Sequence, residues 1–217
     1  MNNSDSIAVK FDNMARFPKN DELGLFKNYD KILEETRRRI IEHNGQYILD
    51  IGCGTGNLCG ELNETYSIIG MDKNLEMLKR AKEKYQHINF KIGNFLDTPF
   101  KENFFDIVVS TFVFHILNEE EKRIAIKNML KYIKDNGKII IVDYMFLDSK
   151  EKDEYKKNFN LNKREDLWDF ISSKHYTNIE ELKNHIVKFN YNIIIQHIVN
   201  FTWIIEITKS KGLLDNC

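Results

Sequence analysis

Residues 47–58 read Tyr-Ile-Leu-Asp-Ile-Gly-Cys-Gly-Thr-Gly-Asn-Leu, and the rest of the chain is organised around them. The apolar run is too short for a helix, and three alternating glycines follow it, so the pattern predicts a strand that ends in a tight turn. A helical pattern begins after the turn. Glycine can adopt positive φ and let a ligand approach the backbone, while a helix start offers free N–H groups. The stretch therefore suits a ligand with a carboxylate, a phosphate or ribose hydroxyls.

Two common nucleotide motifs do not fit this spacing. A dinucleotide fingerprint needs a third glycine where Asn57 stands, and a phosphate loop needs Lys and Ser or Thr after its last glycine. Asp50, Gly52, Gly54 and Gly56 instead resemble motif I of the class I S-adenosylmethionine-dependent methyltransferases, D/E-x-G-x-G-x-G. The resemblance implies that these four residues bind S-adenosylmethionine as the cofactor. A purely structural turn between a strand and a helix is the alternative.

Length and composition narrow the function classes. The chain has 217 residues, the size of one ordinary domain, and we expect a single domain over 1–217. Its 32 basic and 33 acidic residues leave a net charge of −1, so no overall charge favours a nucleic-acid or membrane partner. Three cysteines without paired spacing predict neither a disulfide framework nor a metal site. We find no signal peptide and no apolar span, so we expect a cytoplasmic protein. The oligomeric state stays open.

Short apolar runs alternate with helical patterns along most of the chain, which predicts a parallel sheet with helices on both faces. One helix is expected from 57 to 66, and another ends at Asn136-Gly137. The last two β-rich runs are separated only by Asn200, which forces an antiparallel hairpin. We therefore predict an α/β, Rossmann-like fold with a seven-stranded, mostly parallel sheet and a C-terminal antiparallel hairpin strand. The further strands expected are 67–71, 88–92, 104–110, 138–142, 191–199 and 201–208.

Two segments do not follow this alternation, and we expect both to pack over the ligand-binding edge of the sheet. Residues 1–45 form an N-terminal helical cap, with a break at Phe17-Pro18 and a helix from Asp21 to His43. Residues 146–176 are highly charged and predict one or two inserted helices. Their aromatic residues favour a lid over the acceptor pocket, although they could merely fasten the insertion to the domain. These aromatic residues are Tyr155, Phe159, Trp168, Phe170 and Tyr176.

Polar residues follow the second and third predicted strands. Asp72 ends the second strand, at the edge where open α/β sheets bind ligands, and its carboxylate can accept hydrogen bonds from ribose hydroxyls. A charge at the start of a helix is the alternative. The resemblance places Asn94 beside the adenine, with Phe95 packed on the ring; an Asn side chain keeps the acceptor that an adenine amino group needs. An exposed turn Asn is the alternative there.

The segment after the fourth strand is where the resemblance places residues against the methionine part of the cofactor and the acceptor. Ser110 is the expected cofactor contact. His115 is the first candidate for a general base and Tyr144 the second. A packed histidine that caps the next helix is an equal alternative for His115.

Three stretches extend the resemblance beyond the superfamily: 110–115, 142–143 and 201–206 together resemble the YrrT-like methyltransferases of Gram-positive bacteria. The likeness covers roughly residues 11–209 and implies cofactor contacts from Gly52, Asp72 and Asn94. The N-terminus matches less well. Many relatives have a Tyr-Asp pair there that closes over the cofactor, and we align it with Phe17-Pro18.

These observations together predict a methyltransferase that transfers a methyl group from S-adenosylmethionine to a small-molecule acceptor by in-line displacement. The acceptor wall is expected from residues 11–29, residues 144–176 and Trp203. Neither an Asn/Asp-Pro-Pro-Tyr motif nor a Pro-Cys pair follows the fourth strand, which argues against methylation of nucleic-acid bases. A binding module without turnover and a tRNA or protein methyltransferase are the alternatives.

Overall fold

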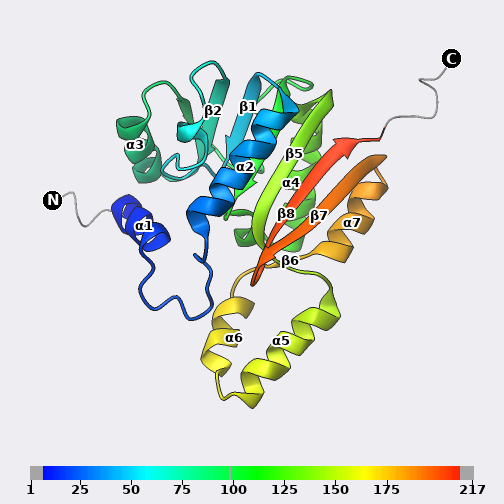
Figure 1. The fold of residues 1–217 in the computed structure, drawn as a ribbon. Coiled ribbons are helices and arrows are strands. Elements are labelled where there is room, and N and C mark those ends of the chain that lie inside the picture. The colour runs from blue at the N-terminus through cyan, green and yellow to red at the C-terminus, as the bar shows by residue number, and fades with distance from the viewer. Residues whose placement is uncertain (1–6, 98, 211–217) are drawn as a thin grey trace.

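The structure is a computed structural model that describes residues 7–97 and 99–210. Its centre is one sheet, in which seven strands lie in the order β3-β2-β1-β4-β5-β8-β7 (Figure 1). A short further strand, β6, pairs with the end of β5. The strands are β1 (Tyr47–Ile51), β2 (Ser67–Asp72), β3 (Asn89–Ile92), β4 (Phe105–Thr111), β5 (Ile133–Phe146), β6 (Thr177–Asn178), β7 (Tyr191–Val199) and β8 (Thr202–Lys209).

The strand pairing confirms the predicted fold class. Strands β1 to β5 pair in parallel, whereas β8 is antiparallel to both β5 and β7. The hairpin turns at Asn200, whose φ of +49° is one that asparagine tolerates. The strand order reverses at β1, which lies between β2 and β4. In open α/β sheets such a switch point opens a ligand crevice at the carboxyl ends of the strands.

Helices cover both faces of the sheet (Figure 1). Alternate residues of β1 point to opposite faces, so Ile48 packs in one core with Ile40 of α2, and Leu49 packs in the other with Met129 of α4 and Ile186 of α7. No helix in the described ranges is long and apolar enough to cross a membrane. The helices are α1 (Ile7–Arg16), α2 (Tyr29–His43), α3 (Leu75–Lys84), α4 (Glu119–Tyr132), α5 (Ser149–Leu161), α6 (Glu165–Ser172) and α7 (Ile179–Val187).

The predicted crossover helix at 57–66 is wrong. The chain there makes only a single 3₁₀ turn, Cys59–Glu61. In an α-helix the Asn57 carbonyl would accept a hydrogen bond from the N–H of residue 61, but here it accepts one from the Arg37 guanidinium at 3.2 Å. The glycine loop therefore has no α-helix start behind it, and the helix-dipole argument for ligand binding does not apply.

The boundary between α4 and β5 also differs from the prediction. The helix ends at Tyr132, and β5 begins directly at Ile133, so Asn136-Gly137 lies inside the strand. Ile133 is buried and pairs with Phe105, after which the register shifts before the regular ladder begins. Tertiary pairing of this buried residue thus takes precedence over the Asn-Gly stop signal.

Helices α5 and α6 lie at the bottom of the view in Figure 1. Residues 146–176 contain α5 and α6, which extend away from the sheet. Helix α1 lies within the range expected for the N-terminal helical cap, but no separate helix was predicted before Phe17-Pro18. Helix α2 begins at Tyr29 rather than Asp21, because the Asp21 carboxylate accepts hydrogen bonds from the N–H groups of Leu25 and Phe26 at 2.7 and 2.9 Å and so stabilises a turn.

Candidate active site

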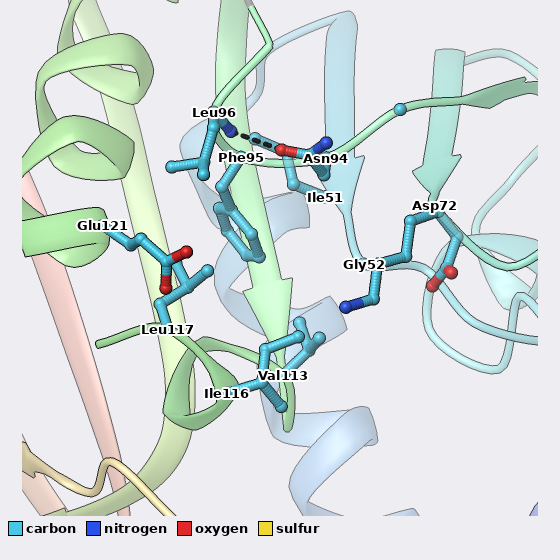
Figure 2. Close-up of a pocket in the computed structure, with 12 residues that line it drawn as sticks. Ile51, Gly52, Asp72, Asn94, Phe95, Leu96, Val113, Ile116, Leu117 and Glu121 are labelled. Carbon is cyan, nitrogen blue, oxygen red and sulfur yellow. Dashed lines mark hydrogen bonds between the residues drawn. The ribbon is translucent and has the colours of Figure 1, made fainter.

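The carboxyl ends of β1 to β4 surround a pocket of about 240 Å³ (Figure 2). Residues after β1, β2 and β3 form one side, and the segment after β4 forms the other. Four predicted cofactor residues line it together: Gly52, Asp72, Asn94 and Phe95. Other lining residues are Leu96, Val113, Ile116, Leu117 and Glu121.

The three glycines of the loop all have positive φ, +77° at Gly52, +54° at Gly54 and +79° at Gly56, but they differ in their surroundings. A Cβ on Gly52 would lie 2.3 Å from a Val113 methyl, and one on Gly56 would lie 3.0 Å from the Tyr85 ring. A Cβ on Gly54 would meet nothing within 4 Å. Gly52 and Gly56 are therefore required by packing, whereas Gly54 faces open space.

Asp72 fastens the glycine loop to the end of β2. One carboxylate oxygen accepts a hydrogen bond from the Gly54 N–H at 2.9 Å, and the other accepts one from the Asn74 N–H at 2.8 Å. The cap of α3 is Asn74 and not Asp72, because the Asn74 side chain accepts the hydrogen bonds from the first turn. Each Asp72 oxygen keeps a further lone pair, so the carboxylate can still accept from two hydroxyls.

Asn94 forms a tight turn at the top of the pocket. Its side-chain oxygen accepts a hydrogen bond from the Leu96 N–H at 2.7 Å (Figure 2), and its own N–H donates to Asp97 at 2.9 Å. The Nδ2 group has no partner in the described chain, so this amide is better placed to donate to a ring nitrogen than to accept from an amino group. The Phe95 ring lines the pocket while packing edge-on against Phe114 at 5.7 Å.

Asp50 and Ser110 are completely buried in the sheet and do not line the pocket. Burial raises the pKa of Asp50 to about 7; the Cys59 thiol lowers it in part, and the charge of Asp72 raises it further. The Ser110 hydroxyl has no partner among the described residues. These two predicted contacts therefore lie behind the pocket wall.

His115 is held by an aspartate that we did not predict as a site residue. Its Nδ1 lies 2.7 Å from one Asp143 oxygen, and its backbone N–H donates to the other at 2.8 Å. The alternative of a packed histidine that caps the next helix is right only about the packing: 14% of the side chain is exposed, but the cap of α4 is Asn118. The sequence signal was Asp143 at the end of β5, which we used only as part of the resemblance.

Tyr144 packs beside His115, with 5.2 Å between ring centroids. Its hydroxyl donates to the Leu25 carbonyl at 3.0 Å. Burial and the neighbouring Asp143 charge hold the pKa of Tyr144 well above its usual value. This phenol keeps its proton at neutral pH, which argues against Tyr144 as the general base.

Sequence reasoning also missed Asp12, which docks α1 onto the glycine loop. Its carboxylate accepts hydrogen bonds from the Thr55 hydroxyl and from Asn57 Nδ2 at 3.1 Å, and Lys84 lies 3.4 Å away. Burial raises the pKa of Asp12, but these hydrogen bonds and the Lys84 charge outweigh it and lower the pKa overall. Phe11-Asp12 shares the aspartate of the Tyr-Asp pair that the resemblance implies, whereas Phe17-Pro18 shares neither residue, and this was the missed signal.

Comparison with known proteins identifies the family. Residues 48–137 match the profile of a methyltransferase domain. An uncharacterized methyltransferase from Alkaliphilus oremlandii is 31% identical over 211 residues, which span 94% of this chain and 95% of that protein. Another from Oceanobacillus iheyensis is 31% identical over 85% of each chain. The chain belongs to the class I S-adenosylmethionine-dependent methyltransferases.

Solved methyltransferase structures share the fold. Magnesium protoporphyrin IX methyltransferase from Synechocystis superposes with a TM-score of 0.70 at 15% identity, covering 93% of this chain and 95% of that one. The matched methyltransferase domain includes residues 50–56, the stretch that resembles motif I. In the described part of this methyltransferase, no group of three or more His, Cys, Asp or Glu residues is arranged to hold a metal ion.

We expect Asp12→Ala to weaken binding of S-adenosylhomocysteine and to lower the melting temperature of this methyltransferase. The change removes the acceptor for Thr55 and Asn57 and leaves Lys84 without its 3.4 Å partner, at a cost of about 1.5–3 kcal/mol. Thermal unfolding with and without the ligand measures both effects. Asp30→Ala is the control, because Asp30 forms only an exposed 3.8 Å pair with Arg16. Unchanged ligand affinity would mean that α1 plays no part in the cofactor site.

Proposed function

We propose that this methyltransferase transfers a methyl group from S-adenosylmethionine to a small-molecule acceptor. The observation that supports this best is the pocket at the switch point of the sheet, where Gly52, Asp72 and Asn94 come together. His115 lies in the segment that follows β4, and residues of this segment also form one side of the pocket. A cofactor site and a proton acceptor thus share one edge of the sheet.

The residues present fit the cofactor. Asp72 would bind the ribose hydroxyls, and the open space at Gly54 leaves room for a ligand against the loop backbone. Asn94 and Phe95 would hold the adenine. The Synechocystis enzyme with the same fold has S-adenosylhomocysteine bound, which supports this assignment. When bound, the cofactor supplies a methyl group on a positively charged sulfur, which is already a good electrophile.

The protein's own contribution is therefore mainly alignment. Holding donor and acceptor in line can provide about 7–11 kcal/mol of the barrier. His115 would take the proton of an acceptor that arrives protonated. Tyr144, with its hydroxyl bound to the Leu25 carbonyl, would serve as a wall beside the imidazole.

A groove of about 360 Å³ lies between the segment at 14–26 and α6, and we propose that it belongs to the acceptor site. Its volume is in the range of small-ligand pockets. Leu25 lines the groove and binds Tyr144, which in turn contacts His115, so one tyrosine connects the groove to the proposed base. The apolar side chains include Met14, Leu23, Phe26, Leu167 and Phe170. In this arrangement α6 and the N-terminal segment form the lid.

Substitutions of two aromatic residues of α6 distinguish a lid over the acceptor site from a helix that is only packed onto the domain. Phe170 lines the groove and is 47% exposed, so Phe170→Ala should raise the acceptor KM with the melting temperature nearly unchanged. Trp168 is only 9% exposed and packs against Phe146, so Trp168→Ala should cost about 3–5 kcal/mol of stability. We compare both variants by thermal unfolding and by steady-state kinetics. The kinetics use the acceptor that the metabolite incubation identifies. A Phe170→Ala variant with an unchanged KM would contradict the lid.

The function is tested by incubating the purified protein with methyl-labelled S-adenosylmethionine and a deproteinised bacterial metabolite extract. We expect S-adenosylhomocysteine to form and the label to enter a small molecule. Cofactor binding without S-adenosylhomocysteine would indicate a binding module. In parallel incubations with tRNA or cell protein, label confined to those fractions would indicate a macromolecular acceptor.

A further inference from the structure

Asp143 makes three contacts that define the protonation of His115. It is completely buried at the end of β5. One oxygen accepts a hydrogen bond from the Tyr144 N–H at 2.7 Å and also lies 2.7 Å from His115 Nδ1; the other accepts from the His115 N–H at 2.8 Å. Both oxygens therefore face backbone donors, which favour the ionised carboxylate.

An ionised Asp143 requires a proton on His115 Nδ1. The hydrogen-bond network thus assigns the tautomer: in the neutral imidazole Nδ1 donates to Asp143 and Nε2 carries the lone pair. No described residue bonds Nε2, and it is not among the buried polar atoms that lack a partner. Nε2 therefore remains available as a proton acceptor for a ligand.

The surroundings of the imidazole contain a second unused polar group. The Tyr176 ring lies 6.0 Å from the His115 ring, and its buried hydroxyl has no partner among the described residues. Burial and the charges of Asp143 and Asp21 raise the pKa of Tyr176, so this phenol stays protonated and can donate a hydrogen bond. The imidazole thus has an unused acceptor, Nε2, and the neighbouring Tyr176 ring carries an unused donor.

We infer that the methyl acceptor is a protic nucleophile, such as an alcohol, phenol or thiol, whose proton passes to His115 while Asp143 positions the imidazole. This inference rests on the proposed function and names its acceptor class. The acceptor–hydrogen bond breaks and the proton joins Nε2. A bond from the acceptor atom to the methyl carbon forms as the sulfur–methyl bond breaks, and its electron pair stays on sulfur. The positive charge passes from sulfur to the imidazolium, which then releases the proton to water.

An acceptor without a proton to lose, such as a thioether or a tertiary amine, would make no use of this arrangement. Its product would carry a new fixed positive charge beside an uncharged imidazole. Asp143 is a positioning residue in this account, because it contacts the base and not the acceptor.

The test is the tautomer of His115 in protein labelled with ¹⁵N-histidine, measured by long-range ¹H–¹⁵N spectra near pH 8. The His115→Gln variant lacks the His115 imidazole, so the signals missing from its spectrum are those of His115 among the six histidines. We expect a protonated Nδ1 and an unprotonated Nε2 in the unmodified protein, and a mixture of tautomers in Asp143→Asn. The exposed Asp153→Asn on α5 is the control and should leave the spectrum unchanged. If Asp143→Asn does not fold, the spectrum of the unmodified protein still decides.

The labelled product of the metabolite incubation gives the second readout. Mass spectrometry should show a methyl group in place of a proton, without a new fixed charge. A protonated Nε2 in the neutral imidazole, or a sulfonium or quaternary ammonium product, would overturn the inference. Formation of S-adenosylhomocysteine in the metabolite incubation keeps the two claims apart: if none forms, the proposed function fails, whereas if it forms, the tautomer or the product can still contradict this inference.

Discussion

Replacing Gly54 by Val should lower the affinity for S-adenosylhomocysteine by more than roughly tenfold, about 1.4 kcal/mol, while the protein stays folded. A Cβ at this position meets no protein atom within 4 Å, so the new side chain would extend into open space beside Asp72, which accepts a hydrogen bond from the Gly54 N–H and lines the pocket. The φ of +54° adds a strain of about 1–2 kcal/mol, which a domain with about 5–15 kcal/mol of stability tolerates. Calorimetric titration beside thermal unfolding measures both quantities.

Two further glycine variants control this experiment. Gly54→Ala should give a smaller loss of affinity in the same direction, because less volume is added. Gly56→Ala should act mainly on stability, since its Cβ would lie 3.0 Å from the Tyr85 ring and 3.3 Å from Phe90. If Gly54→Val binds normally, the loop is a structural turn in this protein and the cofactor placement is wrong.

Replacing His115 by Gln should reduce methyl transfer by about 10²–10⁴-fold, the contribution of a positioned general base. Binding of S-adenosylhomocysteine should change little, because His115 does not line the cofactor pocket. The rate of S-adenosylhomocysteine formation with the identified acceptor measures the first effect, and calorimetry the second.

His175→Gln is the matched control, because His175 is exposed and contacts His115 through a backbone hydrogen bond of 2.9 Å. We expect it to keep nearly full activity. A His115→Gln variant with unchanged turnover would show that the acceptor arrives without a proton to lose, and that His115 is only a packed residue.

Most of the fold follows from local patterns. Buried parallel strands are short apolar runs, and a one-residue join between β-rich runs leaves only the antiparallel hairpin of β7 and β8. Asp72 and Asn94 could be placed because the carboxyl ends of parallel strands meet at one edge, and both residues do line the pocket.

The parts of the fold and of the site that could not be predicted depend on contacts between residues that are distant in sequence. Where the helix was expected at 57–66, Arg37, twenty positions earlier, donates to the Asn57 carbonyl in place of a helical N–H. Asp12 meets the glycine loop and Asp143 meets His115 only after the chain has folded, so the sequence did not show which residues these two carboxylates contact. Asp50 and Ser110 lie behind the wall because they belong to strands that are buried on both faces of the sheet.

The central claim is that S-adenosylmethionine and its product bind in the pocket at the ends of β1 to β4. A calorimetric titration of the unmodified protein and of Asp72→Ala with S-adenosylhomocysteine tests it most directly. The account predicts binding by the unmodified protein and a loss of about 1.5–3 kcal/mol in the variant, since Asp72 both holds the Gly54 N–H and faces the pocket. Equal affinities, or no binding by the unmodified protein, would contradict it.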